Sequence, residues 1–296
     1  MVGALAIAGL AAARGTGTVV GGLTWERRPV DPLPGPRRLD ELRDAEPLGP
    51  AVALAGPRTS GPGGFRFAEA RVAELRGEPT VLVDPNPGPA AVAAGLATAA
   101  RHFGCDVVVL LDVGGDVLAH GDEPGLASPL ADAVLLAATP ALEAAGLRVV
   151  GAVFGAGCDG ELTPAEVAER LREVEAAGGG LGAVGLDSAT RDLVATAVET
   201  VPTEASAMAL RCAHGETGTA AIREGRRSVE LTAAGGAVSF FEPAVALATA
   251  SRLAAAVQDA PDLLAADAVL AGMGIRTELG YERTAGETAA RSDDQD

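Results

Sequence analysis

The fold is decided by residues 107–130, VVVLLDVGGDVLAHGDEPGLASPL, where an apolar run ends at an acidic, glycine-rich turn. The run before Asp112 consists only of Val and Leu, which is typical of a strand covered on both faces of a parallel sheet. Gly114 and Gly115 then allow backbone conformations that side chains would block. Ser128 and Pro129 supply a cap and a first-turn proline for a helix. The stretch therefore predicts a strand, a turn and a helix, the repeating unit of layered α/β proteins.

The same alternation continues on both sides of this stretch. Val-rich runs predict strands at Thr18–Trp25, Ala51–Ala55, Thr80–Val83, Asp106–Val113 and Arg148–Phe154. Segments of helical period predict helices at Val2–Arg14, Phe67–Arg76, Pro89–Phe103 and Ser128–Ala145, and a capping box at Thr163 starts another that runs to Ala177. This order predicts an α/β fold with a mostly parallel, Rossmann-like sheet and helices on both faces, with residues 1–160 as the parallel core.

The second half of the chain has a different pattern. Arg227–Leu231 and Ala237–Phe241, joined by TAAGG, predict a β-hairpin, and helices are expected at Pro243–Val257 and Pro261–Gly272. No linker composition separates the halves, so we predict one α/β domain over residues 1–283, with 161–283 as its C-terminal part. Loops are expected at Pro29–Pro50 and Gly56–Phe65, and a disordered polar tail at 284–296.

Charge restricts the partners of the protein. Forty acidic residues against 23 basic ones give a net charge of −17 over 296 residues, which repels nucleic acid and anionic membranes alike. Every basic residue is Arg, since the sequence contains no Lys. Mechanisms that need a lysine amine, such as a phosphate-loop or Schiff-base lysine, are therefore excluded. Arg side chains or backbone N–H groups are left to bind anions.

The cysteines and the N-terminal segment indicate a cytoplasmic protein. Cys105, Cys158 and Cys212 are widely spaced, which favours neither a disulfide framework nor a zinc site. The apolar segment Met1–Ala13 is shorter than the ~20 residues needed to cross a bilayer, and it lacks a basic flank. We interpret it as a buried helix, with a signal peptide as the alternative. Oligomeric state is left open, and a homo-oligomer is compatible with the sequence.

Carboxylates at the predicted strand ends form the strongest candidate site. Asp112 and Asp116 follow one strand, and Asp159 follows the next within a second glycine-rich loop. Carboxyl ends of parallel strands meet at one sheet edge, where α/β proteins bind ligands. Such carboxylates can hold Mg²⁺ or Mn²⁺ or act as general acid and base. We predict Asp112 and Asp116 as metal ligands and Asp159 as a third catalytic group; the alternative is a turn whose aspartates cap backbone N–H groups.

Other residues near these loops are candidates for supporting roles. Glu123 and Glu204 are predicted as further catalytic groups. We predict that a ligand or cofactor contacts the backbone of Gly114, Gly115, Gly155 and Gly157. Arg226 and Arg227 are candidates for binding a phosphate or carboxylate, and a salt-bridge network is the alternative. Cys158 is a nucleophile or a small buried residue, and His120 is a base or a solvated loop residue.

Several longer motifs resemble one protein family. GGLTWERRPVDPLPGPR, DVGGDVLAHGDEPGLASPLADA, GAGCDGELTPAEV, VPTEAS, IREGRRSVEL and TELGYER together resemble the uncharacterised prokaryotic family called domain of unknown function 1152, from Val2 to about Arg283. The resemblance implies no established activity, but it implies that these motif residues belong together. Family members typically begin with a short strand and a glycine-rich turn before the first helix. Because this sequence starts at that helix, we expect the strand and a phosphate-cradling loop to be missing.

These observations lead to one main functional hypothesis and two alternatives. The main hypothesis is an enzyme, of the metal-dependent hydrolase or transferase type, that acts on a small phosphorylated or nucleotide-like metabolite. One alternative is a non-catalytic ligand-binding or regulatory protein that uses the same pocket. A NAD-dependent Rossmann enzyme is the weakest alternative, because AVALAGPRTS at residues 51–60 lacks the acid that binds the ribose.

Overall fold

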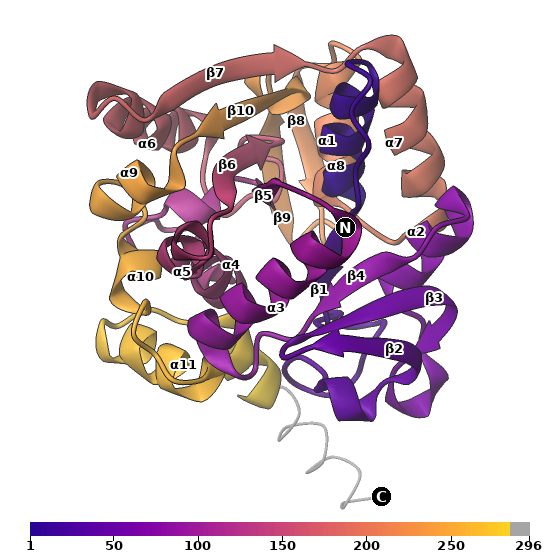
Figure 1. The fold of residues 1–296 in the computed structure, drawn as a ribbon. Helices are drawn as coiled ribbons and strands as arrows, with labels where there is room; N and C mark the ends of the chain where they lie inside the picture. Colours follow the sequence, from indigo (N-terminus) through magenta and orange to yellow (C-terminus); the bar gives the residue numbers. More distant parts are fainter. Residues whose placement is uncertain (285–296) are drawn as a thin grey trace, which may run out of the picture.

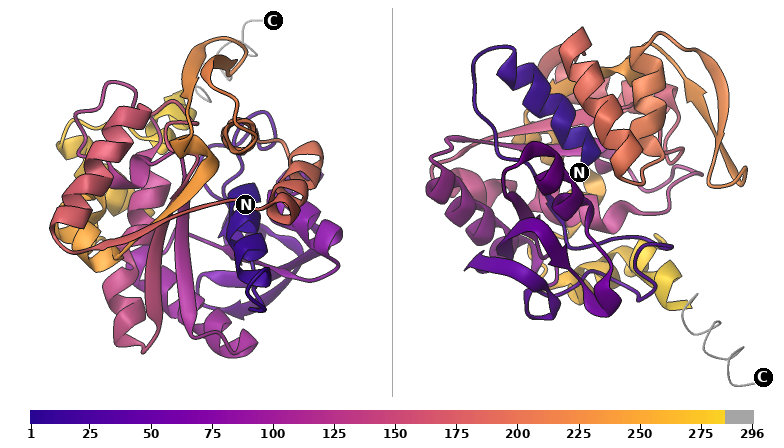
Figure 2. Two further views of the ribbon diagram at one scale, coloured as in Figure 1. Left: turned by 90° about the horizontal axis from the view of Figure 1, so that it is seen from above. Right: turned by 90° about the vertical axis from the view of Figure 1, so that its right-hand side faces the viewer.

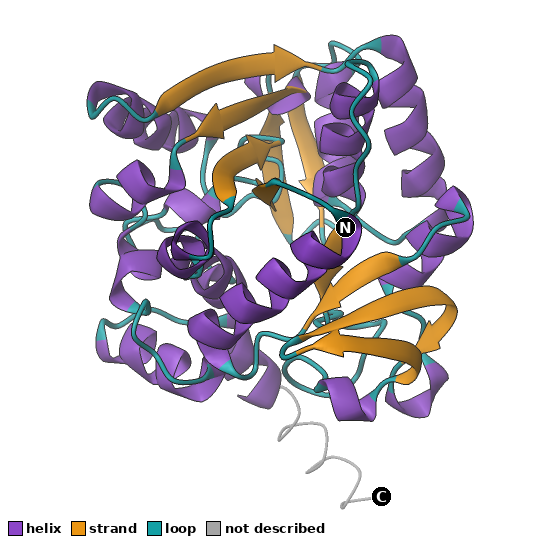
Figure 3. Ribbon diagram, viewed as in Figure 1, coloured by secondary structure: helices purple, strands orange, loops and turns teal. Residues whose placement is uncertain are grey.

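Two four-stranded sheets and a two-stranded hairpin, surrounded by helices, organise residues 1–284, which are the residues that the computed structural model describes (Figure 1). Residues 285–296, most of the predicted disordered tail, lie outside the described residues, and residues 278–284, the last that are described, are helical. The two four-stranded sheets occupy separate parts of the molecule (Figure 3). The largest cluster of buried apolar residues contains side chains of both sheets, including Val52, Val81 and Val153.

The first sheet has the order β1-β4-β3-β2. Its strands are β1 (Gly21–Leu23), β4 (Thr80–Val83), β3 (Val52–Ser60) and β2 (Arg43–Gly49). Only β1 and β4 are parallel, and the other two pairs are antiparallel. The helices α2 (Ala68–Arg76) and α3 (Gly88–Phe103) pack against β3 and β4.

The second sheet carries the candidate site and has the order β5-β6-β10-β7. Its strands are β5 (Val107–Val113), β6 (Arg148–Phe154), β10 (Ala237–Phe241) and β7 (Gly180–Gly185). β5 and β6 are parallel, whereas β10 is antiparallel to both of its neighbours. Along β5, Val109 and Leu111 pack in one apolar cluster and Val108 and Leu110 in another, as the alternation of side chains along a strand requires.

Helices cover both faces of the second sheet, as the sequence predicts. α1 (Val2–Ala12), α7 (Ser188–Thr200) and α8 (Ala205–Ala213) lie side by side on one face (Figure 2). On the other face lie α4 (Pro129–Ala137), α5 (Thr139–Ala144), α9 (Pro243–Ala248) and α10 (Arg252–Ala256). The remaining long helices are α6 (Pro164–Ala176) and α11 (Leu263–Gly272), and short 3₁₀ turns occur at Leu39–Glu41, Pro62–Gly64, Asp116–Leu118 and Ala234–Gly236. None of the described helices is both long enough and apolar enough to cross a membrane.

The predicted mostly parallel, Rossmann-like sheet is wrong in its strand directions. Parallel pairing is restricted to β1–β4 and β5–β6, and both sheets are mixed. The expected loop Pro29–Pro50 contains β2, an edge strand in which Pro47 is tolerated because an edge strand need not donate every ladder hydrogen bond. β1 and β5 lie at the ends of their sheets. The expected upstream strand is outside the sequence and stays a prediction.

The predicted hairpin of 227–241 is also wrong in its pairing. β9 (Arg227–Leu231) pairs with β8 (Gly218–Ile222), and β10 instead enters the second sheet between β6 and β7. The hairpin turn lies at 223–226, where Arg223 and Glu224 have left-handed φ values of 52° and 57°. The segment that was expected to be the turn forms a 3₁₀ turn beside α8, because Gly235 packs against Cys212 and Cys158. Tertiary packing therefore selected the strand partners.

Candidate functional site

Five carboxylates gather at the carboxyl ends of β5 and β6. Single oxygen atoms of Asp112, Asp116 and Asp132 lie within 4.8 Å of one another, and the same holds for Asp116, Asp159 and Glu161. Asp112 belongs to β5 and Asp116 to the following 3₁₀ turn, and Asp132 lies in the first turn of α4. Asp159 and Glu161 lie in the loop after β6. The cluster thus occupies the edge where the two parallel strands end.

Hydrogen bonds join the two glycine-rich loops directly. The Gly157 N–H donates to the Gly114 carbonyl at 2.7 Å, and the Gly114 N–H donates to the Phe154 carbonyl at 3.1 Å. Gly155 and Gly157 have φ values of 69° and 77°, in the region that favours glycine. The loops therefore converge as the sequence predicts. The N–H groups of Gly114, Gly115 and Gly157 are used within the loops, so these glycines act by allowing close approach.

Asp112 has a structural role in its turn. Its Oδ2 accepts hydrogen bonds from Gly115 N–H at 2.7 Å and Val117 N–H at 3.3 Å. Burial raises the pKa of Asp112 to about 6, and the negative charge of Glu161 adds to the effect against the opposing backbone hydrogen bonds. The hydrogen bonds of its Oδ2 thus fit the interpretation of Asp112 as a residue that caps backbone N–H groups of the turn.

Asp116 has no such structural explanation. Its side chain is buried, with 5% of the residue exposed, and its Oδ2 has no hydrogen-bond partner within the described residues. Burial, and after it the charges of Asp112 and Asp132, raises the pKa of Asp116 well above its ordinary value. A buried polar atom without a partner destabilises a fold by about 1–3 kcal/mol. Such atoms are rare in folded proteins, and this one lies among four other carboxylates.

Sequence reasoning gave no role to Asp132 or Glu161, although Glu161 belongs to the predicted second acidic, glycine-rich loop. Asp132 makes no hydrogen bond or ion pair with another described residue, and burial followed by the charge of Asp112 raises its pKa well above the ordinary value. Glu161 accepts the N–H groups of Ala127 and Ser128 at 2.7 Å each, and the Ser128 hydroxyl, so it ties the segment before α4 to the loop after β6. The only local signal for Glu161 was its position two residues after Asp159.

Two arginines of the β8–β9 hairpin reach this loop. Arg223 lies 3.5 Å from the Glu161 carboxylate. Arg227 packs on Gly160, where an added Cβ would lie 2.7 Å from the Arg227 Cδ, and donates to the Gly125 carbonyl at 3.1 Å. Its other terminal nitrogen, Nη1, is buried without a partner. Arg226, also predicted to bind a ligand, lies on the surface with 72% of its side chain exposed.

The structure places Glu123 and Glu204 in supporting contacts outside the two carboxylate groups. Glu123 accepts the N–H of His120 at 2.8 Å and pairs with Arg170 at 3.2 Å. Although burial opposes it, these backbone hydrogen bonds and Arg170 hold the pKa of Glu123 below its ordinary value. Glu204 accepts the Arg223 N–H at 2.7 Å and thereby holds the hairpin turn.

Cys158 lies beside Asp159 but is fully buried. Its Sγ is 3.9 Å from the Sγ of Cys212. The hydrogen bond to Cys212, with burial second, raises the pKa of the Cys158 thiol, which makes it a poor nucleophile at neutral pH. These observations favour the interpretation of Cys158 as a small buried residue.

The C-terminal motif supports the first turn of α4. Glu278 accepts the N–H groups of Leu130 and Ala131 at 3.0 and 2.9 Å and pairs with Arg27 at 3.2 Å. These contacts fix the first turn of α4, which carries Asp132, to a motif more than 140 residues away in sequence. The quoted motifs do lie together, as the family resemblance implies.

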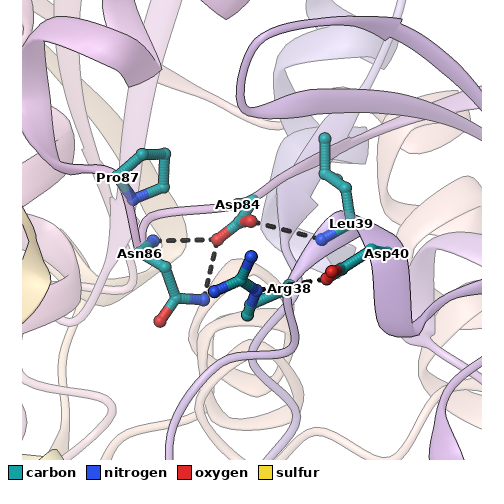
Figure 4. Close-up of a pocket in the computed structure, with 6 residues that line it drawn as sticks. All are labelled: Arg38, Leu39, Asp40, Asp84, Asn86 and Pro87. Carbon is teal, nitrogen blue, oxygen red and sulfur yellow. Dashed lines mark hydrogen bonds and ion pairs between the residues drawn. The ribbon is translucent and has the colours of Figure 1, made fainter.

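A separate cavity opens at the end of β4. It has a volume of about 380 Å³ and is lined by Arg38, Leu39, Asp40, Asp84, Asn86 and Pro87 (Figure 4). Asp84 accepts hydrogen bonds from Leu39 N–H at 3.2 Å and from the backbone and side-chain N–H groups of Asn86 at 2.8 Å. Because its polar groups have partners and none of the five clustered carboxylates lines it, we place the candidate site at the cluster.

The fold and the cluster together define an α/β protein with buried carboxylates at the carboxyl ends of two parallel strands. Residues 1–285 match the family model described as protein of unknown function, DUF1152, and the chain belongs to this family. This match confirms the resemblance of the motifs. No curated protein and no solved structure matches the chain.

Proposed function

We propose that the protein is a divalent-cation-dependent enzyme, a hydrolase or transferase, that acts on a small phosphorylated or nucleotide-like metabolite. The observation that carries this proposal is the buried Oδ2 of Asp116, which has no partner among the described residues, in a side chain grouped with those of Asp112 and Asp132. Carboxylate oxygens are the ligands that Mg²⁺ and Mn²⁺ prefer. No His or Cys belongs to either group of ligand atoms in the described residues, which disfavours zinc.

In this proposal, the cation is held by Asp112 and Asp116, with Asp132 as a third ligand. When bound, it supplies positive charge that polarises a phosphoryl oxygen or lowers the pKa of a water molecule. Asp159 is half-buried, and desolvation followed by the charge of Glu161 raises the pKa of its carboxyl group well above the ordinary value. Without a cation, such a carboxyl group holds a proton, and it releases that proton when a cation binds beside it. Glu123 and Glu204 are positioning residues that hold the loops.

A phosphate-bearing ligand is supported by Arg227. The aliphatic stem of its side chain packs on Gly160, between Asp159 and Glu161 in sequence. One terminal nitrogen of its guanidinium is buried without a partner among the described residues. Guanidinium groups bind phosphate through strong, charge-assisted hydrogen bonds. Without any lysine in the sequence, Arg is the side chain available for this role. The free state of Cys105, Cys158 and Cys212 is compatible with a cytoplasmic location, which is part of the proposal.

The test is a thermal-shift titration with Mg²⁺ and Mn²⁺, followed by a phosphate-release assay on phosphate monoesters and nucleotides. A cation at about 100 times its dissociation constant stabilises the folded state by about 2.7 kcal/mol. We expect this shift in the parent and in Asp122→Asn, an exposed control in the same loop, and its loss in Asp116→Asn. Absence of a cation shift in the parent would refute the proposal. Cation and phosphate binding without turnover would favour the non-catalytic alternative.

A further inference from the structure

Asp116 is the one residue common to both groups of ligand atoms. One group consists of Asp112, Asp116 and Asp132, and the other of Asp116, Asp159 and Glu161. A carboxylate has two oxygens and can give one to each of two cations. In two-metal sites the cations lie about 3.5–4 Å apart, a spacing that a shared carboxylate can span.

The charge of the cluster exceeds what one divalent cation neutralises. The two groups contain five different carboxylates, or −5 once cation binding has displaced their protons. One divalent cation leaves −3 and two leave −1. Among the described residues, the only ion pair to any of the five is that of Arg223 with Glu161. A second cation would remove most of the repulsion in a buried site, where it is strongest.

The two groups differ in how freely their oxygens can bind a cation. Asp132, which belongs only to the first group, makes no hydrogen bond with a described residue, whereas Asp159 of the second group accepts the Glu161 N–H at 3.2 Å. Glu161 in turn already accepts the N–H groups of Ala127 and Ser128. The first group should therefore bind its cation more tightly, and the second group leaves more of the coordination shell to other ligands.

Resting on the proposed function, we infer that the centre holds two divalent cations bridged by Asp116, and that a phosphoryl group of the substrate completes the shell of the second cation. The tight cation belongs to Asp112, Asp116 and Asp132, and the weak one to Asp116, Asp159 and Glu161. The stem of Arg227 packs on Gly160, between Asp159 and Glu161 in sequence, and its unpartnered Nη1 is the donor assigned to the same phosphoryl group. Phosphate and the weak cation then raise each other's affinity by the same factor, because linkage is reciprocal.

The experiment is a calorimetric and electron paramagnetic resonance titration with Mn²⁺, alone and with inorganic phosphate. We expect two Mn²⁺ per chain in the parent, with phosphate tightening the weaker one at least fivefold. Asp159→Asn should retain one Mn²⁺ with the tight affinity unchanged within about threefold, because that variant removes a ligand of the weak position only. Asp132→Asn should weaken the tight Mn²⁺ at least tenfold, and Asp122→Asn should behave as the parent. Circular dichroism verifies the fold of each variant.

The outcomes separate the two proposals. One Mn²⁺ per chain in the parent, with and without phosphate, overturns the two-cation inference and leaves the cation-dependent function standing. No Mn²⁺ in the parent overturns both. If folded Asp159→Asn and Asp132→Asn each lose all Mn²⁺, the five carboxylates form a single site and the inference is wrong. If two Mn²⁺ bind and phosphate changes neither affinity, the assignment of the substrate's phosphoryl group to the second cation is wrong.

Discussion

The carboxylate of Asp159 lies directly over the Cα atom of Gly114. A Cβ added to Gly114 would be 2.3 Å from the Asp159 Cγ and 2.5 Å from its Oδ1. A Cβ atom does not come this close to an atom to which it is not bonded. The end of β5 and the loop after β6 therefore approach each other only because residue 114 lacks a side chain. This contact brings the carboxylates that follow two different strands into one cluster.

Gly114→Ala should therefore damage the site more than the fold. The new Cβ pushes Asp159 away, and the φ of 142° at this position is unfavourable for alanine. We expect a loss of roughly 3 kcal/mol in urea unfolding and loss of the weaker Mn²⁺. Gly104→Ala is the control, because its φ is 67° and nothing lies within 4 Å of the added Cβ. Gly104→Ala should lower the free energy of unfolding by about 1 kcal/mol and leave Mn²⁺ binding unchanged. Equal effects of the two variants would contradict the steric explanation.

Arg227→Gln should weaken phosphate binding, whereas Arg226→Gln should not. Arg227 has a buried nitrogen without a partner, whereas Arg226 is exposed. Hydrogen bonds to charged groups contribute about 1.5–3 kcal/mol, so the dissociation constant for phosphate in the presence of Mn²⁺ should rise at least about tenfold. Isothermal calorimetry measures both variants. A similar loss in the two would indicate long-range charge attraction and remove Arg227 from the site.

Glu69 should make stability fall as the pH rises. Its carboxyl is buried with Oε2 unpaired, and burial followed by the charge of Glu26 raises its pKa from 4.5 to about 8. The folded state therefore holds a proton that the unfolded state releases between these two values, so the stabilisation is complete below pH 4.5 and is lost as the pH rises toward 8. Across this pH range the free energy of unfolding should fall by on the order of 5 kcal/mol because of Glu69.

Glu69→Gln removes this titration and should gain stability relative to the parent between pH 5 and pH 8, about the window that the shifted pKa defines. Glu74→Gln, an exposed change on the same helix, should follow the parent at every pH. Urea unfolding at several pH values measures the three proteins. Parallel curves for the parent and Glu69→Gln would show that Glu69 is not protonated in the folded state.

Trp25, the only tryptophan, should report the docking of the C-terminal segment. Its Nε1 donates to the Glu282 carboxylate at 3.0 Å, and the same carboxylate accepts the Gly35 N–H at 2.7 Å. Glu282→Ala leaves the indole N–H without a partner, so we expect a shifted emission maximum and a loss of about 1–3 kcal/mol. Tyr281→Ala, at an exposed position of the same segment, should change neither when fluorescence is excited at 295 nm, a wavelength selective for Trp.

Local sequence patterns predicted single elements better than their pairing. Arg148–Phe154 and Thr80–Val83 form strands with the predicted bounds, because a short apolar run between turn residues specifies a buried strand. The pairing of Arg227–Leu231 was wrong, since its partner Gly218–Ile222 has no strong apolar alternation. The choice between the two pairings depends on whether Ala237–Phe241 is more favourably buried in the second sheet, which no local pattern describes.

In the candidate site, too, local patterns identify some residues, and others become recognisable only from the tertiary structure. Asp112, Asp116 and Asp159 could be identified because each follows a strand signal with glycines beside it. Asp132 could not, because a charged residue in the first turn of a helix is ordinarily a solvated one that favours the helix dipole. It becomes part of the cluster only because Glu278 and the loop after β6 hold the start of α4 against Asp116.

The local sequence specifies the positions of the buried runs, the glycines at their ends, the absence of lysine and the acidic charge, because these depend on side-chain chemistry and local backbone freedom. Packing in three dimensions selects which strands pair, makes the sheets mixed, and brings five carboxylates into one partly buried cluster, with an oxygen of Asp116 left without a partner among the described residues. The reason is physical: desolvation and close contact are properties of neighbours in space, and these neighbours are brought together by packing across distant segments of the chain.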